Sequence, residues 1–291
     1  MNVDIGRVVS MTLAMFKERF WPMIGLWAVF VAISIAFVIG FLIVVGTSVA
    51  GFASIGPDGF DNPAALGGLG VTVILSMVLF YLLFIAVTFA QQAAMTVMAS
   101  PVERPTFGEA VSRGFKAGLT FLALAILFII AYSVVGLIVA LIFGVAALAG
   151  DIGGAVVSIL LVPIGVYFSC RFAVIMPVVA VERVFNPIKA INRTWNVTDG
   201  RVIGILVVLL INLAAAVALF AIPLVLLFAS GVGAASDPGS LGGPAAVLVF
   251  VSILLFFPLV IVYQIVSTTM TACLHAEISD DQATRMSEVF E

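Results

Sequence analysis

Long uninterrupted runs of apolar residues, separated by short polar segments, dominate the pattern along this chain. Six runs are long enough to cross about 30 Å of hydrocarbon, which takes about 20 residues of helix. Strands of a membrane barrel would instead be about ten residues long, with alternating apolar and polar side chains. The pattern therefore predicts an all-α fold, a polytopic bundle of six transmembrane helices. The expected spans run approximately over residues 21–46, 69–98, 118–149, 155–181, 202–229 and 245–273.

These spans define one transmembrane domain over residues 1–274, followed by a short cytoplasmic tail over 275–291. Composition agrees, because 64% of the residues are hydrophobic, 9% are charged and the mean hydropathy is +1.33. Such values exclude a free soluble enzyme, and a net charge of -3 leaves no basic surface for nucleic acid. Cys170 and Cys273 lie in apolar runs and form neither a disulfide framework nor a zinc motif. No cofactor and no metal site are predicted.

Lys and Arg residues are confined to alternate polar segments. Eleven of the twelve lie before the first span, between the second and third, between the fourth and fifth, or after the sixth. Because basic residues stay on the cytoplasmic side during insertion, both termini are expected in the cytoplasm of a bacterium, with the spans in its inner membrane. A cleaved signal peptide competes for the first span, but the apolar run of about 26 residues exceeds the 7–15 typical of such peptides. The other connections carry only acidic charges, at Asp58, Asp61, Asp151 and Asp237.

The segments that lead into spans 1, 3 and 5 share one design. Residues 4–25, 106–122 and 186–204 each open with a residue that can cap a helix and then combine apolar positions at roughly helical spacing with basic residues. This pattern predicts short amphipathic interfacial helices, with apolar side chains in the acyl boundary and Lys or Arg at the headgroups. Two interpretations remain open, namely three copies of a helix-plus-hairpin unit, or ordinary juxtamembrane helices. Small residues spaced for close helix approach occur at Gly114 and Gly118 and at Gly200 and Gly204.

Arg171 is the only basic residue inside a predicted span. Because an Arg at the centre of a helix costs about 2.5–3.5 kcal/mol on insertion scales, its side chain should face the bundle interior, a water-filled cleft or the headgroups. Val181 lies ten residues further on, or about 15 Å along a continuous helix, which predicts a deep position. Arg171 is either a structural anchor or part of a site for a lipid anion or substrate. Neutral partners are expected among backbone carbonyls, Tyr167, Tyr132, Gln91, Gln92 and Gln264.

Few other residues suggest chemistry. The candidates for binding lipid headgroups or other anions are Arg171, Lys189, Arg193, Arg201, Arg113 and Lys116. His275 is interpreted as an interfacial histidine, since a metal site would need several ligands at fixed helical spacing. No catalytic residue is predicted.

Residues 171–201 carry a recognisable pattern, in which an Arg precedes an apolar run and is followed by a Glu, a Pro and a helix of the type A-x-x-R-[ST]-W-x-[LVI]-[ST]-x-G. This stretch resembles a segment in the membrane domain of glycerophosphoryl diester phosphodiesterases. In fused members that domain precedes a catalytic TIM barrel of about 250 residues, for which the 18 residues after the last span are too few. The resemblance therefore implies a membrane domain without the catalytic activity. The positions on the pattern are Arg171, Glu182, Pro187, Ala190, Arg193, Thr194, Trp195, Val197, Thr198 and Gly200.

The sequence thus favours a non-catalytic integral membrane protein, acting as a membrane scaffold or a lipid-interacting component. Its expected partners are membrane lipids, with anionic headgroups bound by the basic amphipathic segments. The alternative is a transporter or flippase-like protein for a lipid or small amphiphile, which would use Arg171 and the proline-interrupted spans. An intramembrane enzyme ranks third.

Overall fold

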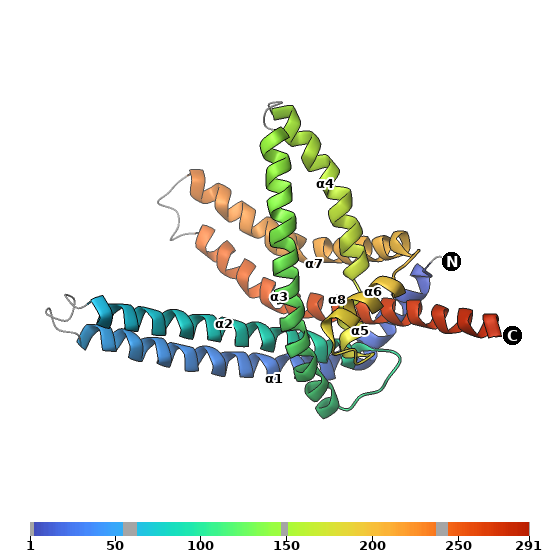
Figure 1. Cartoon of the computed structure of the whole chain (residues 1–291), viewed down its shortest axis with the longest axis horizontal. Coiled ribbons are helices and arrows are strands. Elements are labelled where there is room, and N and C mark those ends of the chain that lie inside the picture. The colour runs from blue at the N-terminus through green and yellow to red at the C-terminus, as the bar shows by residue number, and fades with distance from the viewer. Residues whose placement is uncertain (1–2, 55–62, 147–150, 237–243, 291) are drawn as a thin grey trace.

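The computed structural model of the chain describes residues 3–54, 63–146, 151–236 and 244–290. These ranges are almost entirely helical and contain no strand (Figure 1), which confirms the predicted all-α class. Of the acidic residues expected in the outer connections, Asp58, Asp61 and Asp237 lie outside the described residues. The helices are α1 (Ile5–Ser54), α2 (Pro63–Ala99), α3 (Phe107–Ala146), α4 (Asp151–Phe172), α5 (Ile175–Ala180), α6 (Pro187–Val197), α7 (Val202–Ser236) and α8 (Pro244–Phe290).

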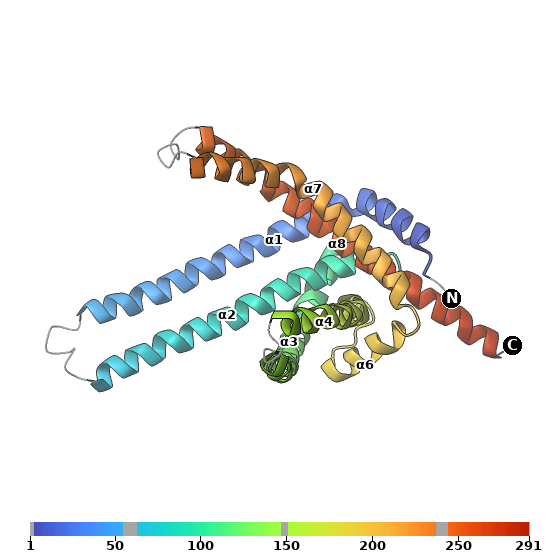
Figure 2. The same cartoon turned by 90° about the horizontal axis from the view of Figure 1, so that it is seen from above.

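Six helices are long and apolar enough to cross a membrane, which confirms the predicted number of spans. They pair in sequence order into three hairpins, α1 with α2, α3 with α4, and α7 with α8 (Figures 1 and 2). The hairpins diverge from a shared region where the polar segments meet, and their tips point in different directions. We call this shared region the base and define it as residues 3–30, 87–124, 170–208 and 265–280. The spans within the described residues are Ile5–Ser48, Gly70–Ala99, Phe107–Val145, Gly154–Ala180, Val202–Ser230 and Ala246–Asp280.

The buried core of the protein lies almost entirely in the base. One cluster contains Phe30, Met95 and Leu124, and a second contains Ile205 and Leu274. Towards their tips the hairpins expose large aliphatic and aromatic side chains over most of their surface. Such a surface would be unfavourable in water, whereas lipid chains solvate it. Protein packing therefore stabilises the base, and the apolar outer halves are suited to a surrounding bilayer.

Helices α2 and α3 approach each other closely in the base. A Cβ atom added at Gly114 would lie 2.5 Å from the carbonyl oxygen of Ala90, and one added at Gly118 would lie 2.8 Å from that of Ala86. The spacing of these glycines thus corresponds to close helix packing, as expected. Gly200 has a different role, because it adopts a left-handed conformation (φ +70°) after α6 and has no neighbour within 4 Å of its added Cβ.

The three opening segments do not form three separate helices. Helices α1 and α3 run unbroken from the amphipathic segment into the span. Only α6 stands alone, because Pro187 and the Asn186 side chain, which accepts hydrogen bonds from two backbone N–H groups, begin it and Gly200 follows it. Residues 275–290 of the expected tail continue α8 rather than forming a separate segment.

The fourth predicted span is interrupted near its end. Helix α4 ends at Phe172, and α5 begins after a turn at Ala173 and Val174. Pro177 explains the break, because in a continuous helix its ring would clash with the carbonyl group of Ala173 and its missing N–H would leave that carbonyl unbonded. In α5 the same proline lies in the first turn, where a missing N–H is tolerated.

Candidate functional site

The break after α4 changes the surroundings of Arg171. Its guanidinium donates to the Asp199 carboxylate at 2.8 Å, to the Trp195 carbonyl oxygen at 3.1 Å and to the Tyr167 hydroxyl at 3.0 Å. It also lies 4.6 Å from the ring centroid of Trp195. Because the helix does not continue to Val181, Arg171 lies in the base and not about 15 Å from the end of a span. The expectation of exclusively neutral partners was therefore wrong, although Tyr167 and a backbone carbonyl were among the groups expected.

The ion pair of Arg171 with Asp199 is asymmetric. The Arg171 side chain is 7% exposed, whereas the Asp199 side chain is 73% exposed. The hydrogen bond from Arg171, followed by its charge, lowers the pKa of Asp199 below its ordinary value. The buried cation is thus compensated by a carboxylate that water still reaches, so neither charge is buried without a partner.

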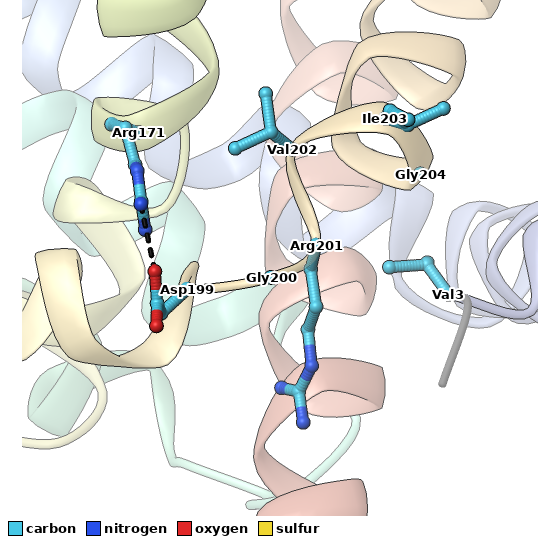
Figure 3. A pocket seen from close by; sticks show the side chains of 8 residues that line it. All are labelled: Val3, Arg171, Asp199, Gly200, Arg201, Val202, Ile203 and Gly204. Atoms are coloured by element: carbon cyan, nitrogen blue, oxygen red, sulfur yellow. Dashed lines mark hydrogen bonds and ion pairs between the residues drawn. The ribbon is translucent and has the colours of Figure 1, made fainter.

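Arg171 and Arg201 line a common pocket of about 400 Å³ at the start of α7 (Figure 3). The guanidinium of Arg201 points away from Arg171 and towards α8, where it donates to the carbonyl oxygen of Ile278 at 2.7 Å. Two of the predicted anion-binding arginines are therefore brought to one place, but both are engaged by protein acceptors. The pocket is lined by Val3, Arg171, Asp199, Gly200, Arg201, Val202, Ile203 and Gly204.

Glu182 joins three elements of the base. Its carboxylate accepts hydrogen bonds from Arg193 of α6 at 2.8 and 3.2 Å and contacts Nε2 of His275 in α8 at 2.9 Å. Burial alone would raise the pKa of Glu182, but the hydrogen bonds and charges of His275 and Arg193 outweigh it and lower the pKa to about 2. His275 is thus a buried partner of Glu182, a contact that the sequence did not suggest.

The position of Glu182 has a counterpart in the preceding unit. The tripeptide Val-Glu-Arg occurs at residues 102–104 and again at 181–183. Glu103 pairs with Arg113, ten residues on, and Glu182 pairs with Arg193, eleven residues on. This repeated tripeptide, followed at similar spacing by an arginine, is the sequence signal that could have identified both pairs. It supports the interpretation of the chain as repeated units.

A second basic pocket lies near the N-terminus of α3. It has a volume of about 290 Å³ and combines the predicted residues Arg113 and Lys116 with Arg183, which the sequence did not single out. Arg183 is the one described non-glycine residue with a left-handed backbone, at φ 61°. The lining residues are Glu109, Ser112, Arg113, Lys116, Arg183 and Phe185.

Arginines and lysines differ in their partners. Every arginine whose side chain is described makes an ion pair or hydrogen bond within the protein, whereas Lys17, Lys116 and Lys189 are exposed and make no ion pair with a described residue. The arginines concerned are Arg7, Arg19, Arg104, Arg113, Arg171, Arg183, Arg193 and Arg201.

Several arginine contacts join segments that are distant in sequence. Arg19 donates to the carbonyl oxygens of Ser100 at 2.9 Å and Glu103 at 3.1 Å, beyond the end of α2. Arg7 pairs with Glu277 of α8 at 3.2 Å. Arginines therefore hold the first and third hairpins together as well as capping the second helix.

One comparison with known proteins assigns the chain to a family. Within the described residues, no group of three or more His, Cys, Asp or Glu side chains could hold a metal ion. No curated protein and no solved structure matches the chain. Residues 143–289 match the family described as the membrane domain of glycerophosphoryl diester phosphodiesterase. This match contains Arg171 and Asp199, and also Glu182 with its partners Arg193 and His275. It confirms the resemblance identified in residues 171–201. The chain is an integral membrane protein that belongs to the glycerophosphoryl diester phosphodiesterase membrane-domain family.

Proposed function

We propose that this protein is a non-catalytic, lipid-interacting component of a bacterial cytoplasmic membrane, with the base and both termini on the cytoplasmic side. In this proposal the base contacts anionic phospholipid headgroups through its lysines. The observation that carries it is the division between the arginines whose side chains are described, which have partners within the protein, and the three lysines, which make no ion pair with a described residue. The orientation rests on the retention of basic residues at the cytoplasmic face.

The chemistry of the two side chains supports this division. A guanidinium is planar and presents five N–H donors, which suits it to several fixed acceptors inside a protein. A lysine ammonium is a compact, strongly hydrated charge on a flexible stem and suits a mobile headgroup. Each opening segment of the three hairpins contains one of the chain's three lysines, at positions 17, 116 and 189.

Each lysine also lies beside an exposed apolar residue. Trp21, four residues after Lys17, is 76% exposed, Leu119, three residues after Lys116, is 68% exposed, and Ile188 next to Lys189 is 64% exposed. Apolar contact and an adjacent cation are the two features that place a segment at the boundary between acyl chains and headgroups. An anionic surface attracts such basic residues by about 1 kcal/mol each.

The alternative of transport depends on Arg171, and its contacts favour a different role. Its guanidinium is hydrogen-bonded to three protein groups and packs against Trp195. We therefore assign Arg171 to anchoring α4 on α6 and its C-terminal loop.

The enrichment of an anionic lipid around the protein in nanodiscs tests the proposal. The full chain, reconstituted into phosphatidylcholine nanodiscs, would be offered phosphatidylglycerol, and the enrichment of that lipid around the protein would be measured. Replacing Lys17, Lys116 and Lys189 together by Gln should lower the enrichment by about two orders of magnitude, or about fivefold per lysine.

The matched control replaces the same three lysines by Arg and should retain the enrichment. Equal enrichment in the Gln and wild-type proteins would show that the lysines do not contact headgroups and would overturn the proposal. Neutralising Arg193 is unsuitable for this purpose, because it would leave Glu182 without its guanidinium partner.

A further inference from the structure

We infer that the basic pocket near the N-terminus of α3 is a defined site for one lipid. This site binds the monoanionic phosphodiester of a single anionic phospholipid. The inference deepens the proposed function and rests on it, because it assumes that the base meets headgroups. Arg113 and Lys116 come from α3 and Arg183 comes from the loop between α5 and α6. The pocket therefore forms only when these two parts of the chain are packed together.

The charges around the pocket match a monoanion. Three cations line it, and two carboxylates lie among them, those of Glu103 and Glu109. Glu103 bridges the guanidinium groups, pairing with Arg113 and lying 3.7 Å from Arg183. One positive charge remains, and Lys116 has no ion-pair partner among the described residues. In an anionic lipid such as phosphatidylglycerol the phosphodiester is the only charged group and would neutralise this charge. In phosphatidylcholine the same phosphodiester is accompanied by a quaternary ammonium group, so the headgroup brings no net charge.

The second carboxylate, that of Glu109, caps the start of α3. Glu109 accepts hydrogen bonds from the backbone N–H of Thr106 at 2.8 Å and from its hydroxyl at 3.1 Å, which closes a capping box at the start of α3. The Ser112 hydroxyl adds a neutral donor to the lining. The volume of about 290 Å³ exceeds that of a phosphate group alone and leaves room for the attached alcohol.

The backbone at Arg183 supplies independent support. A left-handed conformation is unfavourable for a residue with a Cβ, and such conformations concentrate where a side chain must be positioned for function. The neighbouring contacts maintain it, because Glu182 is bound by Arg193 and His275, and the carbonyl oxygen of Phe185 accepts from the Thr120 hydroxyl at 3.0 Å. The result is a guanidinium held at the pocket by a short constrained loop.

The depth of the pocket suits a headgroup. Leu119, which is 68% exposed, lies only three residues after Lys116 on α3, a rise of about 4.5 Å along the helix. Phe185, which lines the pocket, is also exposed. Lipid chains that cover Leu119 would therefore place their phosphate groups near Lys116.

Native mass spectrometry of the full chain in detergent, titrated with phosphatidylglycerol, tests the inference by the occupancy of the first bound lipid. Lys116→Gln should weaken that first binding about fivefold. Arg183→Asn should weaken it similarly, and Asn tolerates the left-handed backbone, so folding is preserved. Lys189→Gln removes the same charge outside the pocket, so it should weaken only the later, weaker lipid contacts and not the binding of the first lipid. Phosphatidylcholine should not occupy the site, and inorganic phosphate should not displace the lipid.

The outcomes separate the inference from the proposed function. If Lys116→Gln and Lys189→Gln weakened the binding of the first lipid equally, the lipid would be bound by a diffuse basic surface. That result would overturn the defined site but would be consistent with headgroup contact. Displacement by inorganic phosphate would show a site for free phosphate and would overturn the assignment to a lipid. Equal binding of phosphatidylglycerol and phosphatidylcholine by all variants would overturn both.

Discussion

Glu182 offers a direct test of what holds the base together. Replacing it by Gln removes the negative charge that accepts from Arg193 and faces His275. The pKa of Glu182 is lowered from its ordinary value of 4.5 to about 2. A difference of this size corresponds to about 3 kcal/mol of stability in the ionised protein. The side chain is only 20% exposed, so solvent screens this contribution weakly.

The pH dependence follows from the direction of this shift. Because the pKa is lower in the folded protein, the contribution of Glu182 is fully present above pH 4.5. It decreases as the pH falls and is lost once the pH passes below about 2. The difference in stability between wild type and Glu182→Gln should therefore be about 3 kcal/mol near neutral pH and should shrink across this acidic window.

Thermal unfolding in detergent micelles, followed by circular dichroism at several pH values, measures this difference. Glu18→Gln is the matched control, since Glu18 forms an exposed pair with Arg104 at 3.7 Å. Such a pair is worth about 0–1 kcal/mol. The reasoning would be refuted if Glu182→Gln cost no more than the control at neutral pH, or if its deficit persisted unchanged at pH 2.

Three further outcomes follow from the packing of the base. Gly114→Ala should destabilise the protein by about 1–3 kcal/mol in thermal unfolding, because the new Cβ would meet the backbone of α2, whereas Gly108→Ala in open space should not; equal midpoints would contradict close packing. Arg171→Met should cost about 2–4 kcal/mol in the same assay, whereas Asp199→Asn should cost clearly less, because only the arginine is buried; the reverse order would be inconsistent with this geometry. Arg183→Asn should unfold at a midpoint no lower than wild type, since it relieves a strain of about 1–3 kcal/mol.

The candidate site was only partly accessible from the sequence. The sequence identifies Arg171, Arg201, Arg113 and Lys116 as candidates for binding anions, and the structure places the first two at one pocket and the last two at another. Their partners were not recognised, because ion pairs depend on which segments meet. Asp199 was overlooked as a partner of Arg171, since the sequence suggested a continuous helix that would keep them apart.

The amino-acid sequence by itself determined the six apolar spans, the helical class and the grouping of basic residues in alternate segments. These properties follow from local composition, because the transfer of each helix into hydrocarbon depends mainly on its own side chains. The tertiary structure alone decided which charges compensate one another. Glu182 and His275 are 93 residues apart and Arg201 and Ile278 are 77 apart, so only helix packing and the break before Pro177 bring them together. A hydrogen bond requires its donor and acceptor to be positioned with a precision of a few tenths of an ångström, and the packing of the base supplies that precision.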